Sequence, residues 1–147
     1  MLQVDLIQEF LRKERIAVVG VSRKNDIPAN EIFNRFKRNG YHTYQINPNS
    51  RSINGEICFE TLHDLPMAPE AVMLAGSPKV SEQLAEDCAR LKIPIVWMHK
   101  GIGVGSYSAV AEEKYKKHGI KVITNGCPLM FVGKVDIFHK FVKWLKK

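Results

Sequence analysis

The sequence predicts an α/β fold in which helices cover both faces of a five-stranded parallel sheet, giving three αβα layers. Short β-branched runs alternate with segments of helical period along most of the chain, and this alternation is typical of parallel α/β proteins. The chain has 147 residues, 45% of them hydrophobic and 25% charged, which is the usual balance for one globular domain. We therefore expect residues 1–147 to form a single domain.

The expected strands are short apolar runs, because a strand of a parallel sheet is covered on both faces. They are Ile16–Val19, His42–Ile46, Ala71–Leu74, Ile93–Trp97 and Lys121–Ile123. The segment Asn47–Pro69 has no helical period and contains Asn-Pro and Asn-Gly pairs. We expect this segment to be an irregular connection with no more than one short turn.

Two amphipathic stretches flank the first expected strand. The opening stretch places Val4, Ile7, Phe10 and Leu11 on one face, and the next places Ala29, Ile32, Phe33 and Phe36 on one face. Pro28 suits the first turn of a helix and Gly40 suits its end. The second stretch therefore predicts a helix from about Pro28 to Asn39.

Later helices are predicted by the same signals. Ser77-Pro78 resembles a cap with a first-turn proline, followed by an apolar stripe at Val80, Leu84, Cys88 and Leu91. Ser106 or Ser108 can cap a third helix that ends at Gly119, in which Glu112 and Glu113 precede Lys116 and Lys117 by four residues. The tail, with Val135, Phe138, Phe141, Val142 and Leu145 on one face, predicts a final helix.

Composition restricts the classes of function. The three cysteines form no C-x-x-C pair, so no disulfide framework or zinc ribbon is expected, and a reduced, cytoplasmic setting is the simplest interpretation. No apolar run is long enough for a membrane span. The formal charge of +7 favours anionic partners, but the aromatic residues fall at core positions, so nucleic acid is not expected.

A phosphate site is predicted directly after the first strand. Gly20 permits a sharp turn and close approach of a ligand, Ser22 supplies a hydroxyl, and Arg23 and Lys24 supply positive charge. In an open parallel sheet, ligands bind beyond the carboxyl ends of the strands. The loops expected to meet there carry Gly20-Val21-Ser22-Arg23, Asn47-Pro48, Ala75-Gly76-Ser77-Pro78 and His99-Lys100-Gly101.

The pattern of these loops disfavours NAD. The first loop lacks the G-x-G-x-x-G fingerprint, and the second strand ends in Asn47-Pro48 with no carboxylate for the ribose hydroxyls. The cation Arg51 follows closely and suits a ribose phosphate, which favours coenzyme A or NADP. The glycine-rich run Gly101–Gly105 follows the wrong strand and is interpreted as an edge of the pocket.

No complete catalytic set is encoded. Cys127 precedes Pro128 after the last strand and could be a nucleophile, but small core cysteines are common and a structural role is favoured. His99 is the histidine on an expected ligand-facing loop, where it could contact a ligand or serve as a plain polar residue. Neither a metal site nor a pair of carboxylates for acid/base catalysis is predicted.

Taken together, several short motifs resemble the single-domain CoA-binding proteins, whose fold is similar to the N-terminal CoA-binding domain of the succinyl-CoA synthetase alpha subunit. The motifs are Val18-Val19-Gly20-Val21-Ser22-Arg23, Gly40-Tyr41 leading to Ile46-Asn47-Pro48-Asn49, Gly55, Leu62 through Leu65-Pro66, Ser77-Pro78, Trp97 with Gly101, and Cys127-Pro128. The resemblance covers about residues 16–131. It implies a Rossmann-like fold with strand order 3-2-1-4-5.

The same resemblance implies residue roles. Gly20, Val21, Ser22 and Arg23 would hold the pyrophosphate of coenzyme A through backbone N–H groups and the nearby helix N-terminus. Asn47 and Pro48 would border the adenosine, and Ser77 and Pro78 would border the opposite wall and the pantetheine arm.

We therefore expect a binder of coenzyme A or an acyl-CoA that acts as a non-catalytic sensor, carrier or regulatory protein. One alternative is an NADP-linked or acyl-CoA-dependent enzyme that uses His99 or Cys127. Another is a protein-interaction module that uses the basic C-terminal helix, Lys140–Lys147. A protein partner or a homodimer stays open.

Overall fold

The structure is a computed structural model that describes residues 3–132 except 25–26 and 101–104. The predicted C-terminal helix, the basic run Lys140–Lys147 and most of the glycine-rich run Gly101–Gly105 lie outside the described residues.

The sheet contains the five predicted strands and two more. Its strands are β1 (Arg15–Val19), β2 (His42–Ile46), β3 (Ser52–Ile53), β4 (Glu56–Phe59), β5 (Ala71–Leu74), β6 (Ile95–Met98) and β7 (Lys121–Ile123). They form one seven-stranded sheet of order β3-β4-β2-β1-β5-β6-β7. Every paired neighbour is parallel except β3, which pairs antiparallel with β4. The predicted α/β class is confirmed.

The predicted strand number and the predicted place of the third strand were wrong. Ala71–Leu74 does not lie beyond β2 but pairs with β1 on its other side, so the five predicted strands have the order 2-1-3-4-5. The position next to β2 is taken by β4. If β4 is counted as the third parallel strand, the parallel order becomes 3-2-1-4-5-6, which is the Rossmann arrangement.

The extra strands form a hairpin in the segment predicted to be irregular. Asn54 and Gly55 have φ of 53° and 78°, as the two central residues of a tight I′ hairpin turn require. The buried amide of Gln45 on β2 supports this hairpin, because its Nε2 donates to the carbonyls of Ile53 and Ile57 at 3.4 and 3.3 Å.

The helices begin and end close to the predicted positions. They are α1 (Gln3–Leu11), α2 (Pro28–Arg38), α3 (Pro78–Gln83), α4 (Ala85–Arg90) and α5 (Ala109–Lys117), with short 3₁₀ turns η1 (Leu62–Asp64) and η2 (Pro128–Met130). Of the two predicted caps for α5, Ser108 is the one used, since its hydroxyl accepts from the Ala111 N–H at 3.1 Å. The single helix predicted after Ser77 is divided into α3 and α4 at Leu84.

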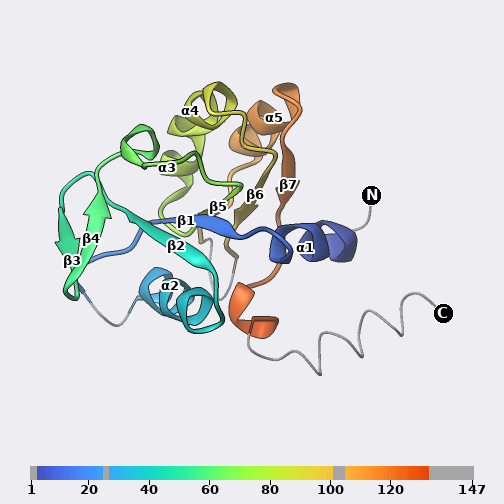
Figure 1. Ribbon diagram of the computed structural model, residues 1–147. Helices are drawn as coiled ribbons and strands as arrows, with labels where there is room; N and C mark the ends of the chain where they lie inside the picture. Colours follow the sequence, from blue (N-terminus) through green and yellow to red (C-terminus); the bar gives the residue numbers. More distant parts are fainter. Residues whose placement is uncertain (1–2, 25–26, 101–104, 133–147) are drawn as a thin grey trace.

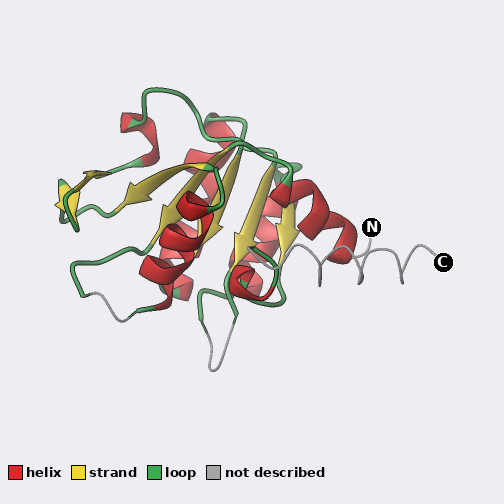
Figure 2. Cartoon of the chain, turned by 60° about the horizontal axis from the view of Figure 1, so that its bottom comes forward, coloured by secondary structure: helices red, strands yellow, loops and turns green. Residues whose placement is uncertain are grey.

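Helices cover both faces of the sheet, as the three-layer prediction requires (Figures 1 and 2). Alternate strand residues face two separate cores: Ile16, Val18, Met73 and Trp97 pack with α1 and α2, and Ala17, Val72, Val96 and Met98 pack with α4 and α5. Trp97 is fully buried and its ring meets that of Phe10 edge-on at 5.3 Å between centroids. This aromatic contact fixes α1 against β6, the neighbour of the edge strand β7.

None of the helices among the described residues is long and apolar enough to cross a membrane.

Candidate functional site

The carboxyl ends of the parallel strands lie at one edge of the sheet, and loops from several strands meet there (Figure 2). The contacts are direct. The Asn47 side chain after β2 reaches the loop after β1, Gly20 after β1 lies against the loop after β5, and the His99 N–H after β6 donates to Leu74 at the end of β5. The predicted convergence of four loops therefore exists in the structure.

The centre of this edge is the close approach of Gly20 to the loop after β5. A Cβ on Gly20 would lie 2.7 Å from the carbonyl carbon and oxygen of Ala75 and from the nitrogen of Gly76. The φ of Gly20 is +109°, a conformation that other residues rarely adopt. The position lies between β2 on one side and β5 on the other, which is the switch point where open α/β sheets bind ligands.

Asn47 supports the loop after β1 from the β2 side. Its Nδ2 donates to the Val21 carbonyl at 2.7 Å, and its Oδ1 accepts from the Asn49 N–H at 2.7 Å. Both ends of the side-chain amide are therefore engaged by the backbone. Pro48, predicted beside it at the same wall, is exposed.

Ser22 is held on its other side by Asn30 of α2. The Ser22 N–H donates to Asn30 Oδ1 at 2.8 Å, and the Ser22 carbonyl accepts from Asn30 Nδ2 at 2.6 Å. The Ser22 hydroxyl oxygen accepts from the Lys24 N–H at 3.2 Å. The Ser22 N–H, expected to face a phosphate, is thus bonded within the protein, whereas no described residue accepts the proton of the Ser22 hydroxyl.

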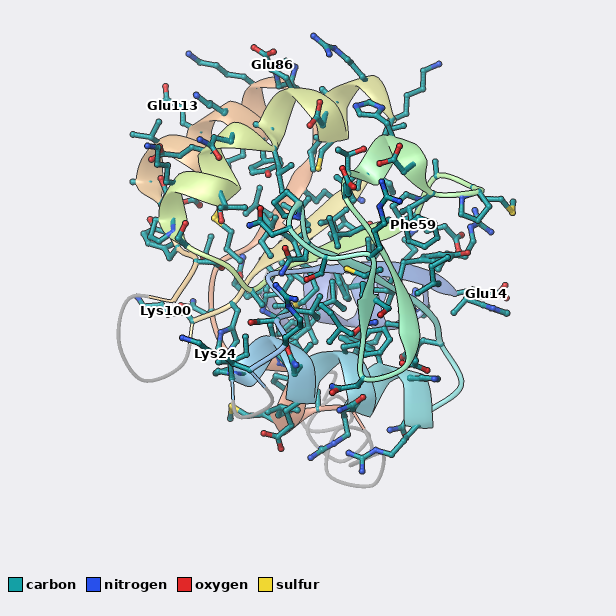
Figure 3. All side chains as sticks on the ribbon, turned by 90° about the vertical axis from the view of Figure 1, so that its left-hand side faces the viewer. Glu14, Lys24, Phe59, Glu86, Lys100 and Glu113 are labelled. Carbon is teal, nitrogen blue, oxygen red and sulfur yellow. The ribbon has the colours of Figure 1, made fainter. Side chains whose placement is uncertain are left out.

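Positive charge lies at this end of the molecule. Arg23 and Lys24 are exposed, and Lys100, which follows His99, is also exposed. In Figure 3, Lys24 and Lys100 lie on the same side of the molecule, and Glu14, at the amino end of β1, lies on the opposite side. The helix α2 begins near the same loop, and its N-cap residue Ile27 supplies no side-chain acceptor to the first turn. These groups suit an anionic ligand.

On the β5 side, the site is bordered by the start of α3. Ser77 is the N-cap, and its hydroxyl accepts from the Val80 N–H at 3.3 Å. Ser77 is exposed, and Gly76 and Pro78 are half-buried. The predicted residues Gly76, Ser77 and Pro78 therefore lie directly beside the loop that Gly20 contacts.

His99 is brought to this edge but is largely buried, with 8% of its surface exposed. Burial lowers the pKa of its imidazole, so the neutral form is favoured at neutral pH. The neighbouring Ser106 is fully buried: its hydroxyl donates to the Leu74 carbonyl at 2.5 Å, and its backbone N–H donates to the His99 carbonyl at 2.9 Å. This serine links the ends of β5 and β6.

The structure places Cys127 after β7 and Arg51 between β2 and β3. Cys127 precedes η2, is half-buried and packs against the core on the α2 side. Burial raises the pKa of its thiol, which disfavours the nucleophilic thiolate. Arg51 is 91% exposed and pairs with Glu60, the residue after β4, at 3.6 Å. Among the described residues, no group of three or more His, Cys, Asp and Glu side chains could hold a metal ion.

A different hollow of the surface lies between α2 and the β3–β4 turn. It is lined by Glu31, Asn34, Lys37, Arg38, Asn54 and Glu56. Lys37 is paired with Glu56 across it, and the lining mixes both signs of charge. The hollow therefore lacks the net positive character of the carboxyl-end site.

Sequence reasoning did not find two residues that shape this site. Asn30 and Ser106 hold the loops through hydrogen bonds. The sequence carried a signal for Asn30, because this polar residue stands next to Ala29, which lies on the apolar face of α2. In the structure Asn30 is 3% exposed. A buried asparagine in a first helical turn needs partners for its amide.

The fold is Rossmann-like, with loops from several strands meeting at the switch point of the sheet. Residues 14–132 match the family described as "CoA binding domain". The chain belongs to that family, and the predicted resemblance is confirmed.

Among curated proteins, the chain is similar to the ADP-forming acetate–CoA ligase II of Archaeoglobus fulgidus. The two are 25% identical over 124 residues, which cover 79% of this chain and 18% of that ligase. The chain is therefore homologous to the CoA-binding region of the ligase and spans about a fifth of its length.

Solved structures share the fold. A hypothetical protein from Pyrococcus horikoshii OT3 is 25% identical, with a TM-score of 0.79 over 88% of this chain and 89% of that one. A Thermus thermophilus protein is 22% identical, with a TM-score of 0.73 over 97% and 99%. The dinucleotide-forming acetyl-coenzyme A synthetase 1 of Ca. Korarchaeum cryptofilum is 22% identical, with a TM-score of 0.64 over 81% of this chain and 27% of that one.

Proposed function

We propose that this chain binds coenzyme A or an acyl-CoA at the carboxyl end of its sheet, with Gly20–Lys24 against the pyrophosphate. The observation that carries the proposal is the packing of this loop between Asn47 and the Ala75-Gly76 backbone. The residues of this loop support the proposal: Gly20 is small, Ser22 carries a hydroxyl, and Arg23 and Lys24 are exposed cations. Membership of the CoA-binding domain family supports the choice of ligand.

The ligand would occupy both sides of the switch point. The Ser22 hydroxyl and the Arg23 and Lys24 side chains would meet the pyrophosphate, with the α2 N-terminus adding a favourable dipole. Pro48 and Arg51 lie on the β2–β4 side and would border the adenosine and its ribose phosphate. Gly76, Ser77 and Pro78 would border the pantetheine arm on the other side.

We further propose that the chain acts as one ligand-binding unit in a non-catalytic role, as a sensor, carrier or regulatory binder. This proposal is supported by the state of the two side chains that an enzyme would use. Burial favours the neutral imidazole of His99 and the protonated thiol of Cys127, and the described residues bring no carboxylate into hydrogen-bond contact with either.

Calorimetric titration of the purified protein with CoA tests the proposal. We expect saturable binding of CoA that weakens by about tenfold or more in Arg23→Glu and Ser22→Tyr, because one reverses a cation and the other fills the loop. Arg90→Glu is the matched control. It makes the same charge reversal on α4, where Arg90 pairs with Glu86, and it should leave the affinity unchanged.

Three results would contradict the proposal. Absence of heat at millimolar CoA would refute CoA binding. Tighter binding of NADP than of CoA would reassign the ligand. Consumption of the thioester of an acyl-CoA, abolished in Cys127→Ser or His99→Ala, would refute the non-catalytic role.

A further inference from the structure

Asn30 makes an unusual pair of hydrogen bonds from the first turn of α2. It is the third residue of the helix and is 3% exposed. Its side chain does not cap its own helix but reaches back eight residues to Ser22, accepting the N–H at 2.8 Å and donating to the carbonyl at 2.6 Å. Both backbone groups of Ser22 are therefore fixed by one side chain.

These bonds determine the direction of the next backbone donor. The described peptide bonds are all trans, and in a trans peptide the C=O and the following N–H point to opposite sides. Because the Ser22 carbonyl faces Asn30, the Arg23 N–H is directed away from Asn30 and α2. Among the described residues, the Arg23 N–H has no hydrogen-bond partner.

The preceding peptide is held in the same way from two elements. Its carbonyl, on Val21, accepts from Asn47 at 2.7 Å, and its N–H, on Ser22, donates to Asn30. Two consecutive peptide planes are thus fixed before any ligand binds. Fixed donors of this kind bind an anion without the cost of ordering the loop at the moment of binding.

We propose that Asn30 is a positioning residue of the ligand site, which aims the Arg23 N–H at a phosphate. The proposal rests on the proposed function, because it assigns this loop to the pyrophosphate of CoA. Asn30 does not itself touch the ligand. It acts through the backbone of Ser22.

The chemistry at this position requires a short amide. Aspartate has the same shape but two acceptor oxygens, so it could accept the Ser22 N–H but would oppose the Ser22 carbonyl. It would also place a negative charge behind a loop that receives a phosphate. Alanine would remove both bonds without adding charge.

The test compares Asn30→Asp and Asn30→Ala with Asn34→Asp. Asn34 lies one turn further along α2 and is exposed, so its variant carries the same charge change on the same helix without touching the loop. Each protein is titrated with CoA by calorimetry below its melting temperature. Two-dimensional amide spectra record the Ser22 and Arg23 N–H groups with and without CoA.

We expect Asn30→Asp to bind CoA about tenfold or more weakly and Asn30→Ala to lose less, while Asn34→Asp matches the wild type. The CoA-induced shift of the Arg23 amide should be lost in both Asn30 variants although they remain folded. A purely structural role would lower the melting temperature and leave that shift unchanged at full saturation, and this result would overturn the proposal.

Failure of the two proposals can be distinguished. If the wild type binds CoA and Asn30→Asp binds equally well, the positioning role is refuted while CoA binding stands. If the wild type does not bind CoA, the proposed function fails and the aiming of the Arg23 N–H at a phosphate is overturned with it. Hydrogen exchange of the Ser22 amide then shows whether Asn30 still fixes the loop: faster exchange in Asn30→Ala than in the wild type and Asn34→Asp would leave only this structural role.

Discussion

Gly20 and Ala75 are in backbone contact, although they belong to loops that follow different strands. The space for a Cβ on Gly20 is already occupied, because the carbonyl carbon and oxygen of Ala75 lie 2.7 Å from its position. The Ala75 N–H also donates to Val19 at 2.9 Å. The first and fourth parallel strands therefore end in a single packed unit, and a ligand at this edge meets both loops at once.

Gly20→Ala should lower the free energy of unfolding by about 2–5 kcal/mol. The estimate combines the strain of a non-glycine residue at positive φ with the displacement of the Ala75 backbone. Gly119→Ala separates the two causes, because Gly119 has φ of +74° but nothing within 4 Å of its Cβ position. Its cost should be about 1–2 kcal/mol, from backbone strain alone.

Urea unfolding of the three proteins measures both effects. Equal losses at the two glycines would show that the Ala75 contact carries no energetic weight. CoA titration should also show weakened binding in Gly20→Ala and unchanged binding in Gly119→Ala, since only the first displaces a loop of the proposed site.

A second prediction concerns the loss of folding stability at acid pH through the imidazole of His99. Burial lowers the pKa of the folded imidazole below its ordinary value, so the unfolded chain takes up a proton first as the pH falls through about 6.5. Stability attributable to His99 is therefore present above that pH and is lost progressively down to the folded pKa. His99→Gln cannot be protonated and should show a flatter pH dependence of its melting temperature.

Thermal melts between pH 8 and pH 5 check the prediction. His118→Gln is the control, because His118 is exposed at the C-cap of α5. If wild type and His99→Gln lose the same stability over this range, the imidazole is not held neutral by the fold.

The strands and helices around the sheet could be predicted because their signals are local. The β-branched run Ile16–Val19 and the apolar stripe of α2 each identify an element without knowledge of its neighbours. The β3–β4 hairpin was missed because neither strand is a continuous buried apolar run of the kind that identifies β5. The sequence signal for the hairpin was the Asn54-Gly55 turn between Ile53 and Ile57. Because the hairpin was omitted, the prediction put Ala71–Leu74 in the position beside β2 that β4 occupies, and the predicted strand order was wrong.

The positions of polar residues that follow strand ends could be predicted from the sequence. Hydrogen bonds and burial that depend on tertiary contacts could not. Ser22 and Ser77 each lie three residues after the end of a strand, so the meeting of their loops could be inferred from topology. That the Ser22 N–H is occupied by Asn30 could not be inferred, because the bond joins two elements through a loop of unpredictable path. The burial of His99 likewise depends on the packing of its neighbours.

The last prediction separates capping from binding at Ser77. Ser77 and Ser108 are both N-caps, accepting from the Val80 and Ala111 N–H groups at 3.3 and 3.1 Å. Replacing either by alanine should lower the free energy of unfolding by about 0.5–2 kcal/mol. Because Ser77 is exposed at the proposed site and Ser108 is buried beside Glu82, only Ser77→Ala should also weaken CoA in a calorimetric titration. If Ser77→Ala binds CoA as tightly as Ser108→Ala does, Ser77 serves the helix alone, and the pantetheine wall must lie elsewhere.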